Sequence, residues 1–142
     1  MLVVLMSSAT KVNRLVPPVS LYPLTPGRWR LLFWPCAIAV LVLSLMPPTQ
    51  PMPTTGWDKS NHALAFLVLA LLGRRAYVGR GVGVLFALVA YGGLIELLQG
   101  MTSYRDADWA DLLADSIGIL LAVVVDWLLA KFSRAGVAGS RE

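Results

Sequence analysis

Four apolar segments, each close to the length needed to cross a lipid bilayer, occupy most of this chain of 142 residues. They extend over residues 29–46, 58–73, 81–101 and 109–130. A helix needs about 20 residues to cross the hydrocarbon core, within a range of about 17–25. The first, third and fourth segments meet this length. The second is shorter and carries Asn61 and His62 near its start, so we expect a thin span packed inside the bundle or one that begins below the membrane surface.

Composition excludes the other common classes of small protein. Hydrophobic residues make up 57% of the chain and charged residues only 14%, whereas a soluble domain has about 25% charged residues. The single cysteine, Cys36, excludes a disulfide scaffold. Because the basic residues form small clusters beside apolar segments, we expect no nucleic-acid partner. The sequence therefore predicts an all-α, polytopic membrane protein, built as a four-transmembrane-helix bundle whose main partner is the lipid bilayer.

The basic residues predict the orientation of this bundle. Four of them precede the first segment or lie at its very start, three lie between the second and third, and three follow the fourth, so these regions hold ten of the 12. By the positive-inside rule, both termini and the middle loop then face the cytoplasm. The sequence thus predicts a multi-pass protein of the inner (plasma) membrane. We expect a cytoplasmic N-terminal segment over residues 1–27, a membrane domain over 28–131 and a cytoplasmic tail over 132–142.

Smaller features refine this expectation. No basic stretch precedes the apolar N-terminus, so the first span is expected to act as an uncleaved signal anchor. Pro35 should kink that span. The uncharged loop over residues 47–57 should be extended on the outer side. Trp57 and Trp109 are placed at the outer interface and Trp127 at the inner one.

The acidic residues show the opposite distribution to the basic ones. Six of the eight lie at the predicted outer ends of the second, third and fourth spans: Asp58, Glu96, Asp106, Asp108, Asp111 and Asp115. From a rise of about 1.5 Å per residue, His62, Glu96 and Asp115 lie roughly 6, 8 and 10 Å below the outer ends of their spans. A charged group deep in lipid costs about 2.5–3.5 kcal/mol on insertion scales. We therefore expect these side chains to converge on a small pocket that opens outward.

Roles in this pocket follow from residue type and helical spacing. His62, Glu96 and Asp115 are candidate catalytic residues, because an imidazole with carboxyl groups can perform acid–base chemistry. The candidate ligand-binding residues are Asp58, Lys59, Gln99, Arg105, Asp108 and Asp111. Arg105 is expected to grip an anion, to pair with Glu96, Asp108 or Asp111, or to do both.

Structural alternatives stand beside these roles. Asp106 and Asp108 are interpreted equally as solvated loop acids, and Asp58 with Lys59 as a helix start. Asp126 is interpreted as a structural or snorkelling residue near Lys131 at the inner interface. Gly92 and Gly93 are interpreted as allowing close helix contact or as leaving space beside Glu96.

Three short motifs, taken together and in this order, resemble the VanZ-like family of small bacterial membrane proteins over about residues 40–125. They are Asp58-Lys59-x-x-His62, Gly93-x-x-Glu96-x-x-Gln99 and Arg105-x-x-Asp108-x-x-Asp111-x-x-x-Asp115-x-x-Gly118. The sequence departs from the family at Asp115, where Asn is usual, and at Phe66, where Tyr is common. The resemblance implies the four-helix fold and a cell-envelope location. It also implies an association with glycopeptide resistance, chiefly to teicoplanin, through the name-giving member.

Four functions remain open on the sequence alone. The first is an envelope protein that binds or modifies a lipid-linked or cell-wall-related ligand, and the second is a transporter or flippase subunit, which would require oligomerisation. The third is a structural, partner-binding protein. The fourth is a metal site made by His62, Glu96, Asp111 and Asp115, although we expect no metal and no cofactor. The sequence leaves open whether the protein is an enzyme.

Overall fold

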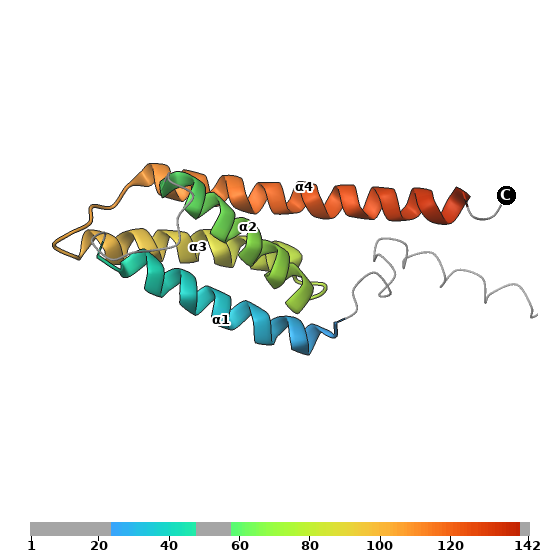
Figure 1. Cartoon of the computed structure of the whole chain (residues 1–142), viewed down its shortest axis with the longest axis horizontal. Coiled ribbons are helices and arrows are strands. Elements are labelled where there is room, and N and C mark those ends of the chain that lie inside the picture. Colours follow the sequence, from blue (N-terminus) through green and yellow to red (C-terminus); the bar gives the residue numbers. More distant parts are fainter. Residues whose placement is uncertain (1–23, 48–57, 140–142) are drawn as a thin grey trace, which may run out of the picture.

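A computed structural model describes residues 24–47 and 58–139, with side chains described as far as residue 132. This part of the chain forms four helices: α1 (Pro26–Leu45), α2 (Asp58–Ala76), α3 (Gly81–Gly100) and α4 (Trp109–Gly139). They run roughly lengthwise beside one another, as Figure 1 shows. The predictions for the N-terminal segment, the loop with Trp57 and the last three residues lie outside the described residues.

The helix bounds agree with the apolar segments except at three places, one of which is the end of α2, which continues three residues beyond its segment to Ala76. α1 begins at Pro26, directly after Thr25, as expected for proline in the first turn of a helix, and it continues unbroken through Pro35. α4 does not end where the apolar segment ends but continues to Gly139. The charge of Lys131 ends the apolar stretch, but lysine is a good helix former and does not end the helix.

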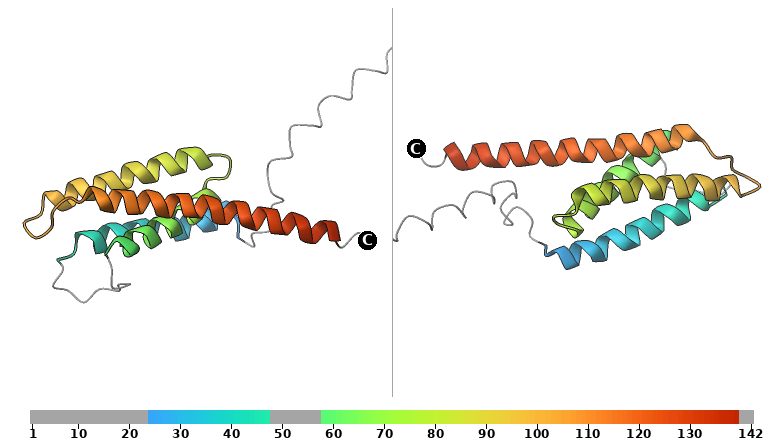
Figure 2. Two further views of the ribbon diagram at one scale, coloured as in Figure 1. Left: turned by 90° about the horizontal axis from the view of Figure 1, so that it is seen from above. Right: turned by 180° about the vertical axis from the view of Figure 1, so that it is seen from behind.

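α2 and α3 each pack against the other three helices, and the most extensive interface is the one between α2 and α4. The two further views in Figure 2 show α2 beside α4 along the first part of that helix. Phe66, Leu69 and Ala70 of α2 are fully buried. A Cβ atom added at Gly118 of α4 would overlap the backbone carbonyl of Ala63, so glycine at this position lets the α2 and α4 backbones approach closely.

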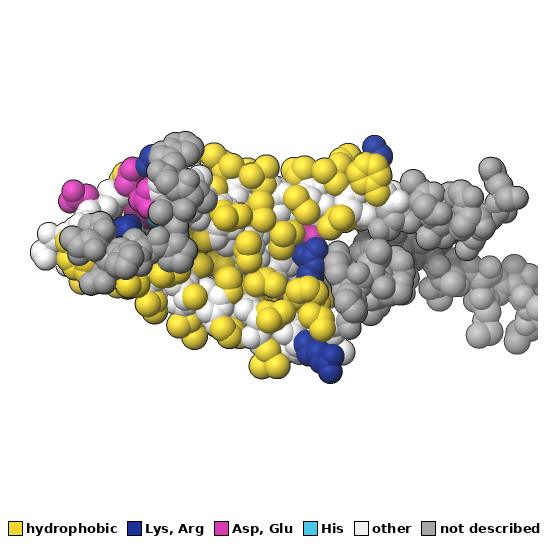
Figure 3. Space-filling view, viewed as in Figure 1, with side chains coloured by type: hydrophobic (Ala, Val, Ile, Leu, Met, Phe, Trp, Pro, Cys, Tyr) yellow, Lys and Arg dark blue, Asp and Glu magenta, His cyan; other side chains and the backbone are white. Residues whose placement is uncertain are grey.

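Three of the described helices are long and apolar enough to cross a membrane: α1, α3 and the part of α4 from Trp109 to Phe132. α2 is not among them. Large apolar side chains such as Leu31, Phe86 and Leu120 are exposed on these helices, and Figure 3 shows the apolar surface between two charged ends. Since monomeric soluble proteins rarely expose apolar surface on this scale, the chain is a membrane protein in contact with the lipid bilayer.

An ion-pair network joins the C-terminal end of α2 to α4, at the end of the bundle away from Asp58. Asp126 of α4 pairs with Arg74 Nε at 2.7 Å and with a terminal nitrogen of Arg75 at 3.0 Å. The structural interpretation of Asp126 agrees with these contacts, although its partners are arginines of α2 and not Lys131. Lys131 lies over the Trp127 ring, 5.3 Å from its centroid. The network fixes the end of α2 against α4.

Candidate functional site

The start of α4 is fixed by Asp108, the residue just before the helix. Its Oδ1 accepts a hydrogen bond from the Ala110 N–H at 2.8 Å, and its carbonyl accepts one from the Asp111 N–H at 2.9 Å. A side chain that accepts from the first turn in this way is a helix N-cap. Asp111 and Asp115 follow on the face of α4 that packs against α2, where they contact Lys59 and His62.

Lys59 joins the starts of α2 and α4. Its Nζ donates to Asp108 Oδ2 at 2.6 Å and to Asp111 Oδ1 at 3.0 Å. The hydrogen bond from the Lys59 ammonium, helped by the Ala110 N–H, holds the pKa of Asp108 below its usual range. The side chain of Asp108 is 51% exposed, so water screens this pair and its contribution to stability is small.

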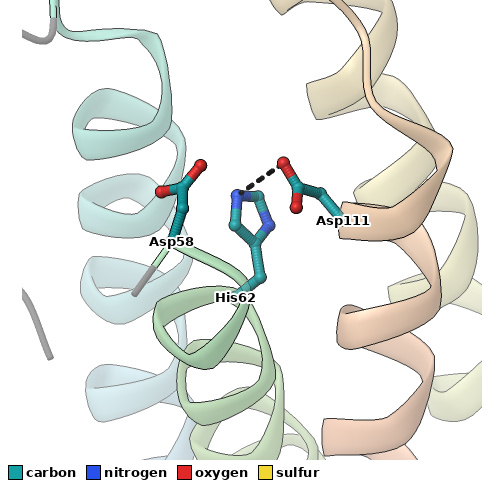
Figure 4. Close-up of side chains that lie close together, drawn as sticks. All are labelled: Asp58, His62 and Asp111. Carbon is teal, nitrogen blue, oxygen red and sulfur yellow. Dashed lines mark ion pairs between the residues drawn. The ribbon is translucent and has the colours of Figure 1, made fainter. Parts of the chain in front are cut away.

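His62 lies deeper, between carboxylates of α2 and α4. Its Nδ1 is 3.0 Å from Asp115 Oδ1, and its Nε2 is 3.8 Å from Asp111 Oδ2. Figure 4 shows the imidazole with the carboxyl groups of Asp58 and Asp111 on either side. The exposed fraction is only 7% for His62 and 0% for Asp115. When Nδ1 carries a proton, it donates to Asp115 Oδ1, and Nε2 then faces the carboxyl groups of Asp58 and Asp111.

Glu96 reaches the same region from α3. Its Oε2 accepts the backbone N–H of Asp108 at 2.8 Å, and the residue is 3% exposed. The other oxygen of Glu96 and the Oδ2 of Asp115 are buried and accept no hydrogen bond from the described residues. Buried polar atoms without a partner are rare in proteins. The two free oxygens therefore mark this region as a site where a proton or a ligand belongs.

Gly92 of α3 makes room for one of these oxygens. A Cβ atom at Gly92 would lie 2.5 Å from Asp115 Oδ2, whereas one at Gly93 would meet nothing within 4 Å. The expectation for this pair was close helix contact or space beside Glu96. The structure shows the close helix contact at Gly92 alone, where the side chains of Asp115 and Leu112 of α4 lie against it.

Gln99 and Arg105 lie outside the hydrogen-bonded groups of His62 and Lys59. Gln99 is buried, and its amide donates to the Ser44 carbonyl at 2.8 Å, which ties α3 to the end of α1. Arg105 is half-buried and makes no hydrogen bond or ion pair with the residues that the structure describes. The predicted pairing of Arg105 is thus wrong. Lys59 holds Asp108 and Asp111, while Glu96 accepts a backbone N–H.

Arg105 instead lines a cleft of about 200 Å³ between α1 and α2. The apolar side chains in its lining include Val40, Leu43 and Leu64, and the polar ones include Asp58, His62 and Arg105. Ser44 also lines the cleft and was missed by the sequence reasoning. It is the only hydroxyl residue in the apolar part of α1, and that isolation was the available signal.

The structure brings six of the nine predicted site residues together in two hydrogen-bonded groups, which approach each other between His62 and Asp111. His62 bonds to Asp115, Lys59 joins Asp108 and Asp111, and Asp108 connects them to Glu96. No protein-family model, curated protein or solved structure matches this chain. A function must therefore be argued from the geometry of the cleft and of the two groups, together with the motif resemblance.

Proposed function

We propose that this protein is a VanZ-like integral membrane protein of the cell envelope that binds an anionic, lipid-linked or cell-wall-related ligand in the cleft between α1 and α2. One observation carries the proposal. The guanidinium of Arg105 lines the cleft without a carboxylate partner among the described residues, although several carboxylates lie at the same end of the bundle. A guanidinium group suits the bidentate recognition of phosphate or carboxylate.

The rest of the cleft fits an amphipathic ligand. Val40, Leu43 and Leu64 line it on the apolar side, and Leu64 is 53% exposed. This apolar wall is continuous with the surface that contacts lipid, so an acyl or polyprenyl chain can lie along it. The anionic head group of the same molecule would then reach Arg105. Lys59 is already engaged by two aspartates, which leaves Arg105 as the cation for this head group.

We assign any acid–base chemistry on the ligand to His62, oriented by Asp115. His62 lines the cleft, whereas the Asp115 side chain is fully buried next to it. A histidine held in one tautomer by a carboxylate is a common arrangement for a general base. Binding through Arg105 does not depend on such chemistry, so the proposal concerns a binding site in the first place.

We further propose that α2 is a fourth span and that both termini are cytoplasmic in the plasma membrane. The 19 residues of α2 lie among three apolar helices, and its last turn carries Arg74 and Arg75. The polar start of α2 is engaged with α4 through Lys59 and His62. These contacts reduce the penalty of placing polar groups near the membrane, and the distribution of basic residues supports this orientation.

A second candidate function is a subunit of a proton-coupled transporter or flippase. The observation in its favour is the pair of buried carboxylate oxygens, on Glu96 and Asp115, that accept no hydrogen bond from described residues. Ionisable groups buried in a membrane protein commonly belong to proton relays. Proton-driven uptake into liposomes that depends on Glu96 would favour this function over ligand binding alone.

The binding proposal is tested by the lipids that stay with the purified protein. The wild type, Arg105→Gln and Arg80→Gln are purified in mild detergent, and bound molecules are identified by mass spectrometry. Arg80 is an exposed arginine before α3, at the other end of the bundle, and is the matched control. We expect an anionic lipid-linked molecule on the wild type and on Arg80→Gln, with at least a tenfold loss on Arg105→Gln. Equal retention by all three proteins would overturn the proposal.

A further inference from the structure

Three side chains beside the cleft between α1 and α2 are arranged as a ligand set for a metal ion. One ligand atom each from Asp58, His62 and Asp111 lies within 4.8 Å of the other two. Figure 4 shows these three side chains close together, from α2 and α4. We propose that these three residues bind a divalent transition-metal ion through one imidazole nitrogen and two carboxylate oxygens. The protein can bind this metal ion without a lipid-linked ligand, so the inference goes beyond the proposed function.

The secondary structure places the three ligands with little freedom. Asp58 and His62 are four residues apart on α2 and share one face of that helix. Asp111 comes from the first turn of α4, opposite them. Bonds of about 2.0–2.2 Å from a metal to nitrogen and oxygen put ligand atoms about 3–4.4 Å apart. The 3.8 Å between His62 Nε2 and Asp111 Oδ2 already lies in this range, and Asp58 at the exposed helix start can move closer.

The second observation is the state of His62 itself. This residue is more than nine-tenths buried, and its Nε2 makes no hydrogen bond with the described residues, because the nearest carboxylate oxygen is 3.8 Å away. The other ring nitrogen is held by Asp115 Oδ1 at 3.0 Å. A carboxylate that holds one nitrogen of a histidine while the other binds a metal is the usual outer-shell arrangement in metalloproteins.

Lys59 orients the second carboxylate in a similar way. Its Nζ donates to Asp111 Oδ1 at 3.0 Å, and the other oxygen of Asp111 is the one that faces His62. Three aspartates, at positions 58, 111 and 115, surround a single imidazole. Such a concentration of negative charge near a membrane is costly, and a bound dication would offset it.

The donor set narrows the kind of ion. Imidazole nitrogen favours zinc and its neighbours in the first transition row over Mg²⁺ and Ca²⁺, and two carboxylates are compatible with Zn²⁺ or Mn²⁺. Zinc sites with three protein ligands keep a fourth position for water or a substrate oxygen. Here Asp58 and His62 also line the cleft that contains Arg105. The Irving–Williams order of metal affinities predicts tighter binding of Zn²⁺ than of Mn²⁺.

The test uses the full-length protein in detergent, stripped of metal with a chelator and with no lipid-linked ligand added. Zn²⁺ binding is measured by isothermal titration calorimetry and Mn²⁺ binding by electron paramagnetic resonance. We expect one Zn²⁺ per chain, bound more tightly than Mn²⁺. Asp58→Asn and His62→Gln should each weaken binding at least tenfold, and Asp115→Asn about 10–100-fold through the outer shell.

Asp106→Asn is the matched control, because Asp106 is an exposed acid at the same end of the bundle and lies outside the proposed ligand set. It should bind Zn²⁺ with the affinity of the wild type. Helical circular dichroism identifies any variant that fails to fold, and Asp58→Asn, at the exposed helix start, keeps the test decisive if His62→Gln does not fold. Absence of saturable binding, or equal affinity in Asp58→Asn and the wild type, would overturn the metal site while leaving the role of Arg105 to its own experiment.

Discussion

His62 of α2 and Asp115 of α4 form a buried hydrogen bond of 3.0 Å between Nδ1 and Oδ1. The two residues come from positions 53 apart in the sequence, and the bond crosses the interface between the two helices. Removal of one partner from a buried pair leaves the other without compensation, which costs more than the bond itself contributes. The pair therefore fixes how α2 and α4 pack, in addition to orienting the imidazole.

Substitutions at Asp115 should separate the hydrogen bond from the charge. Asp115→Asn keeps an acceptor oxygen for His62, so we expect it to fold with near wild-type stability. Asp115→Leu leaves the buried imidazole without an acceptor and should destabilise the protein by about 1–3 kcal/mol. Unfolding in detergent with increasing denaturant measures both. Equal stability of Asp115→Leu and the wild type would contradict this account of the pair.

Gly92→Ala and Gly93→Ala form a matched pair of substitutions within α3. Both replace glycine by the best helix former, a gain of about 1 kcal/mol in a helix interior. Only the Cβ at Gly92 would meet Asp115 Oδ2, at 2.5 Å, and overpacking of this kind typically costs about 1–3 kcal/mol. We expect Gly92→Ala to be less stable than Gly93→Ala in the same unfolding assay. The reverse order would show that Asp115 moves away freely.

The helices could be predicted from the sequence because each is an apolar stretch ended by charge, proline or glycine. The starts of α2, α3 and α4 agree with the predicted segments, and α1 starts three residues before its segment, at Pro26. The C-terminal end of α4 could not be predicted in this way, because hydropathy reports where a helix leaves the membrane and not where it unwinds.

The gathering of polar residues was also predictable, but the choice of partners was not. Helical spacing and depth placed His62 and Asp115 near each other, and the structure joins them. Arg105 is expected to pair with at least one of Glu96, Asp108 and Asp111, but Lys59 is the cation that reaches Asp108 and Asp111. Which of two cations reaches a carboxylate depends on the loop geometry between α3 and α4, and spacing along a helix does not contain that information.

The pair of Lys59 and Asp108 predicts a pH dependence. Because the folded pKa of Asp108 lies below its usual range, the pair stabilises the fold above the ordinary carboxyl pKa, and that contribution is lost as the pH falls through the lowered value. Titration of ¹³C-labelled aspartate by NMR in micelles should show Asp108 protonating at a lower pH than an ordinary aspartate. Lys59→Met should move its midpoint upward, and an unchanged midpoint would mean that the ammonium does not hold the carboxylate.

The orientation of the bundle is tested by single cysteines in a Cys36→Ser background. Position 80, in the connection between α2 and α3, and position 106, between α3 and α4, lie in exposed segments at opposite ends of the described structure. With a cytoplasmic middle loop, a membrane-impermeant maleimide should label Asp106→Cys in intact cells. It should label Arg80→Cys only after the membrane is permeabilised. Only α3 separates the two positions, so labelling of both from outside would show that α3 does not cross the membrane. Labelling of position 80 alone would show that the orientation is the reverse of the proposed one.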